Sequence, residues 1–444
     1  MDGPLAKIAN LSFETGVQPE KLKMAKVIPI YKKGSKLTTY NKNEMIYKHQ
    51  YVFRKRHSTN HALVSITEQI RKALDENKFA FEIFVDFQKA FDTVNHDILL
   101  EKLERYGISG NINNWFRSYL KDRKQTVSIL GFESNERILS HGVPQGSVLG
   151  PLLFLLYIND LHRAIKSSTV FHFADDTNLL LIGDCTKTIQ KQLNLDLKEL
   201  YRWLLANKIY LNVSKTELII FKRQQTQIPT TKIMLNGSKI YPSDSIKYLG
   251  VYIDADLSGI THCNQLLPKI RRANGMLAKA RHHLADPKDL LSLYHSLFSS
   301  TQTYGAQIWG LLTNPKMDKI ERAQKAALRI ITFADHNAHS APIFQKLKIL
   351  RLQDHIQLQH ILFVYDFINK NLPNSFNDFY VDNDTDWVQT RAESEAVTKL
   401  AYASEYKQVK YGRKSITHTS VAIWNRFAKH ISWILICPIC LENH

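Results

Sequence analysis

The sequence predicts an α+β first part followed by an α-helical second part, with the boundary near residues 255–260. Before the boundary, short apolar runs rich in Val, Ile and Phe alternate with amphipathic segments, as buried strands and surface helices do. From about residue 262 the apolar residues recur almost only at helical spacing. With 444 residues, 44% of them hydrophobic, the chain is long enough for a sizeable core divided among two or three subdomains.

The early part of the chain predicts one buried strand between two helices. Residues 58–78 have the spacing of an amphipathic helix, with Ser58 as its N-cap. The run "FAFEIFVDF" at 79–87 is too apolar for a loop and predicts a buried strand. Residues 95–107 predict a helix that begins at an Asn cap and ends at a Gly.

The middle of the chain predicts further strands around one long helix. Residues 232–241 predict a hairpin, because Asn236-Gly237 suits a type I′ turn. The long helix is expected at about 186–206. The other expected strands cover residues 124–130, 169–174, 178–182, 211–222 and 246–254.

The charge balance indicates a polyanionic partner. The net charge is +18, which suits nucleic acid or an acidic membrane surface. The apolar stretch "ISWILICPIC" is too short to span a bilayer, so nucleic acid is favoured and no membrane partner is expected. Four cysteines form no plausible disulfide framework, and the N-terminus has no apolar leader. We therefore expect an intracellular protein, in the nucleus or the cytoplasm.

Adjacent carboxylates are the most informative feature of the sequence. Asp175 and Asp176 lie in "FHFADDTNLLL", where two apolar runs joined by a short polar link predict a hairpin with carboxylates at its tip. Asp86 ends another buried strand, and the carboxylates converge if the two strands are neighbours. Such oxygen ligands suit Mg²⁺, with waters and substrate phosphates completing its shell. Taken alone, "ADD" would more often be a polar turn, because Asp is a common turn residue; it is the combination with Asp86 and the motifs below that favours a metal site.

A loop rich in Gly and Pro opens into an apolar helix at residues 141–160. Gly142, Gly146 and Gly150 would allow the backbone to approach a bound group closely. Gln145 can form hydrogen bonds there but carries no charge. Such a loop is weak support for a site when it stands alone.

Five motifs in order give a specific resemblance. They read "FVDFQKAFDTV", "GVPQGSVLGPLLF", "FADDTNLLL", "LNVSKTELIIF" and "IKYLGVYID". This series resembles the palm motifs of the reverse transcriptases of non-LTR (LINE-type), jockey-like retrotransposons. It covers about 25–255 and continues more loosely through "YGAQIWG" (304–310), "ERAQKAALRII" (321–331) and "SITHTSVAIWNRF" (415–427). The resemblance implies a right-hand polymerase fold, with fingers and palm in 1–255, a helical thumb in 256–335 and a C-terminal helical region in 336–444.

The same resemblance implies an RNA-directed DNA polymerase, a nucleotidyltransferase that uses Mg²⁺ or Mn²⁺. Asp86 and Asp175 would be the principal metal ligands, and Asp176 would complete the acidic cluster. Lys215 matches the lysine that would protonate the leaving pyrophosphate, although a solvated lysine explains it equally well. The implied partners are an RNA template, a DNA primer and dNTPs, while the oligomeric state stays open.

Substrate-contacting residues also follow from the resemblance. Phe91 occupies the position that would block a ribose 2′-OH by steric clash. The other implied nucleotide-binding residues are Phe87, Gln145, Gly146, Lys32 and Arg54. The implied primer grip is Tyr248, Leu249 and Gly250.

Two basic helices predict contacts with a nucleic-acid backbone. Residues 269–284 contribute Arg271 and Arg272, and would lie in the thumb. Residues 316–331 place basic side chains at intervals of three or four along one face, the spacing of a stripe that could track phosphates. A solvated helix face is an equal alternative for this stripe. Its residues named as candidate contacts are Lys319, Arg322 and Arg329.

The chain departs from the family pattern near its N-terminus. The family follows its basic fingers strand with an Arg-containing segment that reads like YRPIS. Here "YKKGSKLTTYNKNEMIYKHQ" runs on without it, so a triphosphate-binding arginine is missing. We therefore expect a fragment that lacks the family's endonuclease and part of the fingers. A polymerase and a catalytically impaired nucleic-acid-binding remnant are both open readings.

A zinc site at Cys437 and Cys440 is also open, because one CxxC supplies too few ligands.

Overall fold

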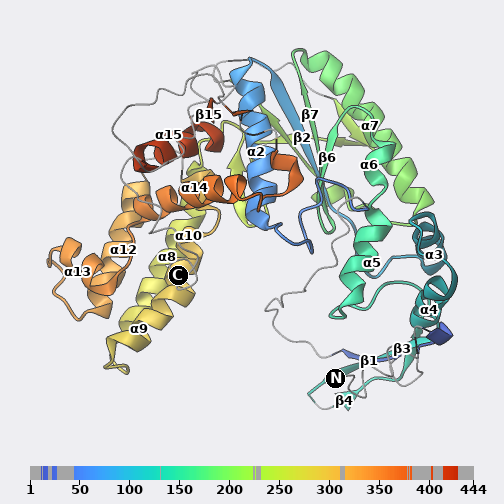
Figure 1. The fold of residues 1–444 in the computed structure, drawn as a ribbon, viewed down its shortest axis with the longest axis horizontal. Coiled ribbons are helices and arrows are strands. Elements are labelled where there is room, and N and C mark those ends of the chain that lie inside the picture. The colour runs from blue at the N-terminus through green and yellow to red at the C-terminus, as the bar shows by residue number, and fades with distance from the viewer. Residues whose placement is uncertain are drawn as a thin grey trace, which may run out of the picture.

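The computed structural model describes residues 12, 14–18, 23–27, 45–130, 132–223, 226, 232–310, 316–377, 379, 381–382, 402–403 and 414–428. Figure 1 shows two arms joined by a sheet and one long helix, α2 (Thr59–Asp75). One arm holds helices α3 to α5, and the other holds helices α8 to α13.

The central sheet has five strands in the order β11-β8-β2-β7-β6. All pairs in it are antiparallel except β11 with β8. Its two central strands, β2 and β7, pair from Phe79 opposite Gly183 to Val85 opposite Thr177. The bounds are β2 (Phe79–Val85), β6 (Thr169–Phe173), β7 (Asp176–Gly183), β8 (Glu217–Phe221) and β11 (Pro242–Ser243).

Alternate residues of the sheet face two different hydrophobic cores, as the two-residue period of a strand requires. In β2, Ala80 and Phe84 face the core that contains α2, whereas Phe81, Ile83 and Val85 face the other core. This second core packs beneath helices α3 (His96–Arg105), α4 (Gly110–Leu120), α5 (Leu149–Ile158), α6 (Leu161–Ala164) and α7 (Thr186–Ala206). The sheet is therefore covered by a hydrophobic core on each face.

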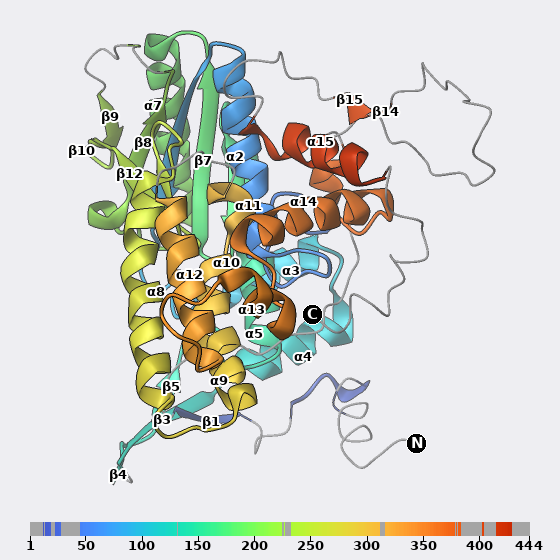
Figure 2. The ribbon, with the colours of Figure 1, turned by 90° about the vertical axis from the view of Figure 1, so that its left-hand side faces the viewer.

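The helical second part packs on the first core. Figure 2 shows α8 and α12 side by side, and these helices form one of the larger helix contacts. The same core continues into α14 and α15, which lie against each other near α2. The bounds are α8 (Ile260–Ala280), α9 (Pro287–Leu293), a π-helix η3 (Tyr294–Ser299), α10 (Ser300–Thr303), α11 (Ala306–Trp309), α12 (Met317–Ile331), α13 (Ser340–Leu347), α14 (Leu352–Ile368), a 3₁₀ turn η4 (Asn374–Phe376) and α15 (Ile416–Ala428).

Smaller sheets complete the described fold. At the end of the α3–α5 arm, β3 pairs with β1 in parallel and with β4 and β5 in antiparallel. Two hairpins, β9–β10 and β12–β13, follow the central sheet, and β14 pairs with β15. The bounds are β1 (Met24–Val27), β3 (Arg123–Ile129), β4 (Phe132–Glu133), β5 (Arg137–Leu139), β9 (Ile233–Leu235), β10 (Ser238–Ile240), β12 (Ser245–Tyr248), β13 (Val251–Asp254), β14 (Val381–Asp382) and β15 (Tyr402–Ala403).

Most expected elements are confirmed. Ser58 caps α2 by accepting a hydrogen bond from the His61 amide, and Asn95 caps α3 in the same way from Ile98. The helix expected at 186–206 coincides with α7. The hairpin β9–β10 turns at Asn236-Gly237, both with positive φ, as a type I′ turn requires.

Two expectations need correction. Residues 246–254 form a hairpin rather than one strand, because Leu249 and Gly250 both adopt positive φ and reverse the chain between β12 and β13. The strand expected at 211–222 is shorter, since a 3₁₀ turn at Val213–Lys215 precedes β8. The second part is almost wholly helical where the structure describes it, as expected, with one short pair of strands, β14 and β15.

Candidate active site

An acidic edge lies at one end of the central sheet. Asp86 directly follows β2, Asp176 is the first residue of β7, and Asp175 lies in the tight turn between β6 and β7. Since Val85 pairs with Thr177 in the antiparallel register, the next positions along the two strands are Asp86 and Asp176. The expectation that the two carboxylate-bearing strands are neighbours is confirmed.

The carboxyl group of Asp176 has a raised pKa. Its partial desolvation by the surrounding protein, followed by repulsion from the charges of Asp175 and Asp86, raises the pKa of Asp176 to about 6. Part of its surface nevertheless remains in solvent. A carboxyl group with a raised pKa gives up its proton more readily when a cation binds beside it. This donor set therefore fits a divalent metal ion.

The ion would take only part of its shell from the protein. Among the described residues, no group of three or more His, Cys, Asp or Glu side chains could hold a metal ion by itself. Mg²⁺ is commonly bound by one or two carboxylates, with waters and substrate phosphates as its other ligands. An ion at this edge would thus be held jointly with a bound nucleotide.

The segment before β8 returns to the same edge. The amide of Asn212 donates a hydrogen bond to the backbone carbonyl of Asp86 at 2.9 Å, and Phe87 forms a β-bridge with Leu211. Lys215 follows three residues after Asn212 and is exposed. This placement is compatible with a catalytic lysine, whose role stays a prediction.

The glycine-rich loop lies against the segment after Asp86. The amide of Val143 donates to the carbonyl of Phe91, and Gln145 Nε2 donates to Asp92 Oδ1 at 3.0 Å. The ring of Phe91 stacks on Phe154 of α5, with centroids 4.4 Å apart. Gln145 therefore lies near Phe91, because its hydrogen-bond partner Asp92 is the next residue after Phe91.

Two of the three loop glycines pack closely on the protein. A Cβ at Gly142 would lie 2.9 Å from the carbonyl oxygen of Asp92, and one at Gly150 would lie 2.4 Å from that of Pro144. At Gly146, which is exposed, a Cβ would meet nothing within 4 Å. Packing therefore already requires glycine at Gly142 and Gly150, and the approach of this loop to a bound group stays a prediction.

The remaining nucleotide-binding candidates differ in which of their atoms could reach a nucleotide. Phe87 is 6% exposed and packs in the core, so only its backbone could reach a nucleotide. Arg54 Nη1 donates to the carbonyls of Tyr47 and Gln50, which leaves other N–H groups of the guanidinium for a ligand. Lys32 lies outside the described residues, as do Cys437 and Cys440.

The three primer-grip candidates form the tip of the β12–β13 hairpin. Tyr248 is buried, and its ring lies edge-on to Phe84 of β2 at 5.2 Å. Leu249 and Gly250 make the turn, and the hydroxyl of Tyr304 donates to the carbonyl of Leu249 at 2.6 Å. The tip is thus attached to the strand that leads into Asp86.

The basic candidates lie on two packed helices. Arg271 and Arg272 of α8 and Lys319 and Arg322 of α12 are exposed. Arg329 is half-buried, and its Nε donates to the carbonyl of Ala338 at 2.9 Å, so this side chain holds the following loop. Contact of these residues with nucleic acid stays a prediction.

Sequence reasoning missed two polar side chains near the site. Glu82, in the middle of β2, is fully buried, and only its charge within an apolar run signalled it. Tyr304 binds Leu249 at the hairpin tip from 55 residues away in sequence, which no local pattern could show.

Comparisons with known proteins agree with this geometry. Residues 20–253 match the family model described as "Reverse transcriptase (RNA-dependent DNA polymerase)". The probable RNA-directed DNA polymerase from transposon BS of Drosophila melanogaster is 28% identical over 332 residues, which cover 69% of this chain and 35% of that protein. The RNA-directed DNA polymerase from mobile element jockey of the same fly is 26% identical, over 80% of this chain and 42% of that protein.

A solved telomerase structure from Candida tropicalis, in complex with a TWJ fragment of telomeric RNA, covers 81% of this chain and 54% of its own. Its TM-score to this chain is 0.36, and the two sequences are 14% identical. The chain itself spans about 35% to 42% of the length of the two fly relatives.

The chain belongs to the reverse transcriptase family. Its mainly antiparallel central sheet, covered by a core on each face and carrying the acidic edge, is the palm of a right-hand polymerase fold. Within the family it is a jockey-like member, of the kind found in non-LTR retrotransposons. None of the helices among the described residues is long and apolar enough to cross a membrane.

Proposed function

We propose that this chain catalyses RNA-directed DNA synthesis, adding dNTPs to the 3′-OH of a DNA primer paired with an RNA template. The acidic edge carries the proposal, because Asp86 and the Asp175-Asp176 turn end two neighbouring strands of a rigid sheet. In the reaction the primer 3′-oxygen bonds to the α-phosphorus of the dNTP, and the bond from that phosphorus to the pyrophosphate oxygen breaks.

Each group at the edge has a role in this proposal. Asp86 and Asp175 would hold Mg²⁺ or Mn²⁺, which would lower the pKa of the 3′-OH and stabilise the leaving oxygen. Phe91 would exclude a ribose 2′-OH, and Lys215 would donate a proton to pyrophosphate. The basic surfaces of α8 and α12 would contact the backbone of the RNA–DNA duplex, inside the cell, in the nucleus or the cytoplasm.

Primer extension with the purified chain tests the proposal. With Mg²⁺ or Mn²⁺ and a DNA-primed RNA template, we expect extension that Asp175→Asn lowers by more than roughly 100-fold, since even outer-shell partners of metal ligands are worth 10- to 100-fold. Asp184→Asn is the matched control, because Asp184 is exposed and follows the opposite end of β7. Extension that survives in the Asp175 variant would contradict the proposed site.

An impaired nucleic-acid-binding remnant is the second candidate. The observation in its favour is the missing Arg-containing segment after "YKKGSK", which in the family precedes the palm. The remnant would bind primer–template but extend it with neither metal, even at millimolar dNTP. The same assay, run beside a binding titration, therefore separates the two candidates.

A further inference from the structure

The segment "YGAQIWG" (304–310) packs directly on the hairpin that carries Leu249 and Gly250. Besides the hydrogen bond from the Tyr304 hydroxyl to the Leu249 carbonyl, Gly305 lies so close to β13 that a Cβ there would be 2.5 Å from Cγ2 of Val251. Trp309 Nε1 in turn donates to the carbonyl of Tyr304 at 2.8 Å. The segment and the hairpin are therefore joined by hydrogen bonds and by close packing.

Tyr304 also lies directly beside Gly250 at the tip of the hairpin. The three atoms nearest to a Cβ built at Gly250 all belong to Tyr304, with the ring carbon Cε1 at 3.1 Å. Beside it lies a cavity of about 280 Å³, lined in part by Gly250, Tyr304 and Lys269. Leu249 has a φ of +44°, a conformation that L residues rarely adopt. The strained turn is thus held from outside the hairpin by the Tyr304 hydroxyl, beside this hollow, and by the packing of Leu249 on the first core.

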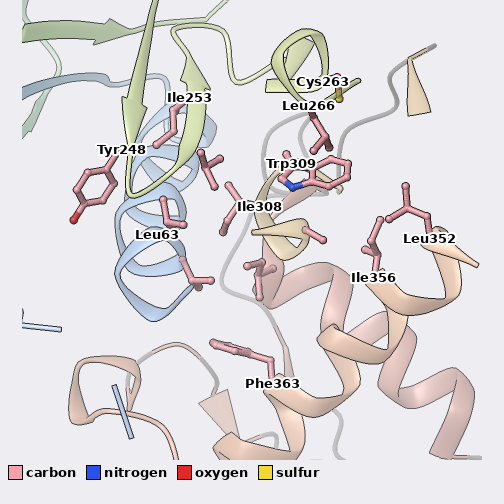
Figure 3. Close-up of a cluster of buried hydrophobic side chains, with 14 of the residues drawn as sticks. Leu63, Tyr248, Ile253, Cys263, Leu266, Ile308, Trp309, Leu352, Ile356 and Phe363 are labelled. Atoms are coloured by element: carbon pink, nitrogen blue, oxygen red, sulfur yellow. The ribbon is translucent and has the colours of Figure 1, made fainter. Parts of the chain in front are cut away.

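The hairpin that Tyr304 holds also contacts the strand that leads to the acidic edge. Figure 3 shows Tyr248 and Ile253 on one side of the buried cluster and Trp309 with Leu266 on the other, with Ile308 between them. Tyr248 contacts Phe84, two residues before Asp86. A displacement of the turn would therefore change the distance between its tip and the carboxylates.

We propose that Tyr304 is a positioning residue, which holds the Leu249-Gly250 turn so that the primer 3′-OH lies in line with the α-phosphate. This inference rests on the proposed function, because it needs a primer at the turn. Tyr304 acts through the turn and not by touching the reacting atoms. Removing its hydroxyl should therefore slow the chemical step without weakening the binding of primer–template or dNTP.

The variant Tyr304→Phe removes the hydroxyl and keeps the ring. We expect kcat for primer extension to fall about 3- to 10-fold, the size expected for one lost hydrogen bond, with primer–template Kd and dNTP KM within about 2-fold. Amide hydrogen exchange in a peptide covering 245–254 should become faster. Tyr241→Phe is the matched control, since Tyr241 is 68% exposed and its ring lies under Lys239 Nζ, at 4.5 Å from the centroid, and not against the turn.

A double variant sharpens the test. Gly250→Ala should lower kcat by itself, because its Cβ would push the Tyr304 ring and its φ of +83° disfavours Ala. If both changes act through one turn, their effects in Gly250→Ala/Tyr304→Phe will be less than multiplicative, whereas independent roles would multiply. Independent, multiplicative effects would contradict the proposal.

The remaining outcomes are decisive as well. If Tyr304→Phe changes neither kcat nor exchange, the positioning role is overturned. If it weakens primer–template binding and leaves kcat unchanged, Tyr304 binds nucleic acid directly and the proposal is wrong. If the unmodified chain extends no primer, the proposed function fails, and exchange in 245–254 still shows whether Tyr304 holds the turn.

Discussion

The buried carboxyl group of Glu82 predicts an unusual dependence of stability on pH. Glu82 is 0% exposed, Oε1 accepts a hydrogen bond from Asn178 Nδ2 at 3.2 Å, and Oε2 has no hydrogen-bond partner in the described part of the chain. Burial raises the pKa of Glu82 from 4.5 to about 8. At neutral pH the group is therefore protonated in the folded protein and ionised in the unfolded chain.

The size of the effect follows from that difference. At 1.36 kcal/mol for each pH unit, a rise from 4.5 to about 8 corresponds to roughly 5 kcal/mol of unfolding free energy. Because the folded pKa is raised, this stability is fully present below pH 4.5 and is lost progressively as the pH rises to about 8. Between these values the slope approaches about 1.4 kcal/mol per pH unit.

The substitution Glu82→Gln isolates this effect, because Gln has the shape of protonated Glu and does not titrate. Urea unfolding of both proteins between pH 5 and pH 7.5 should show wild-type stability falling relative to the variant by about 3 kcal/mol, slightly less than 2.5 pH units at the limiting slope, because the slope is smaller near both pKa values. The exposed Glu217, at the start of β8, gives the matched control Glu217→Gln. Curves for wild type and Glu82→Gln that stay parallel across this range would refute the reasoning.

Three further outcomes are expected. Mg²⁺ should raise the melting temperature more at pH 7.5 than at pH 5, because the pKa of Asp176 is raised to about 6 and protons compete with metal at the lower pH; an equal rise at both pH values would count against the metal site. Primer–template affinity should fall by ~10³-fold or more between 50 and 200 mM salt if six or more phosphates are contacted, and a flat titration would remove the electrostatic reading. Gly142→Ala should destabilise the protein by about 2 kcal/mol or more in thermal unfolding, because its Cβ would meet the Asp92 backbone. Gly146→Ala has a similar φ but open space, so equal losses in the two variants would show that the contact with Asp92 is unimportant.

The sequence predicted what depends on local pattern. Caps at Ser58 and Asn95, the α7 period and the Asn236-Gly237 turn were all readable, because each rests on a few neighbouring residues. The reversal at Leu249-Gly250 was not, since Leu rarely adopts positive φ. The carbonyl of that Leu is held by Tyr304, whose contact only the folded chain reveals.

The candidate site shows the same division. The three carboxylates could be named from their positions after and between apolar runs, and the resemblance gave them roles. Their common edge depends on the pairing of β2 with β7, strands whose first residues are Phe79 and Asp176. Hydrophobic alternation fixes which face of a strand is buried but cannot fix its partner. The burial of Glu82 followed from the same pairing, which set Asn178 opposite Phe84 and near Glu82.

The helices after the palm are part of what keeps the acidic edge in place. Glu68 of α2 accepts hydrogen bonds from the amide of Ile416 at 2.8 Å and from the hydroxyl of Thr417 at 3.1 Å, so its carboxylate caps the start of α15. Arg71, one turn further along α2, forms an ion pair with Glu68 at 3.2 Å. Because α2 covers one face of the sheet while α11 and α15 cover α2, the core behind β2 contains residues from both parts of the chain. The expected boundaries at 255 and 335 therefore do not separate independent hydrophobic cores among the described residues, and a chain cut at 255 would expose the apolar face of α2 that supports the carboxylates.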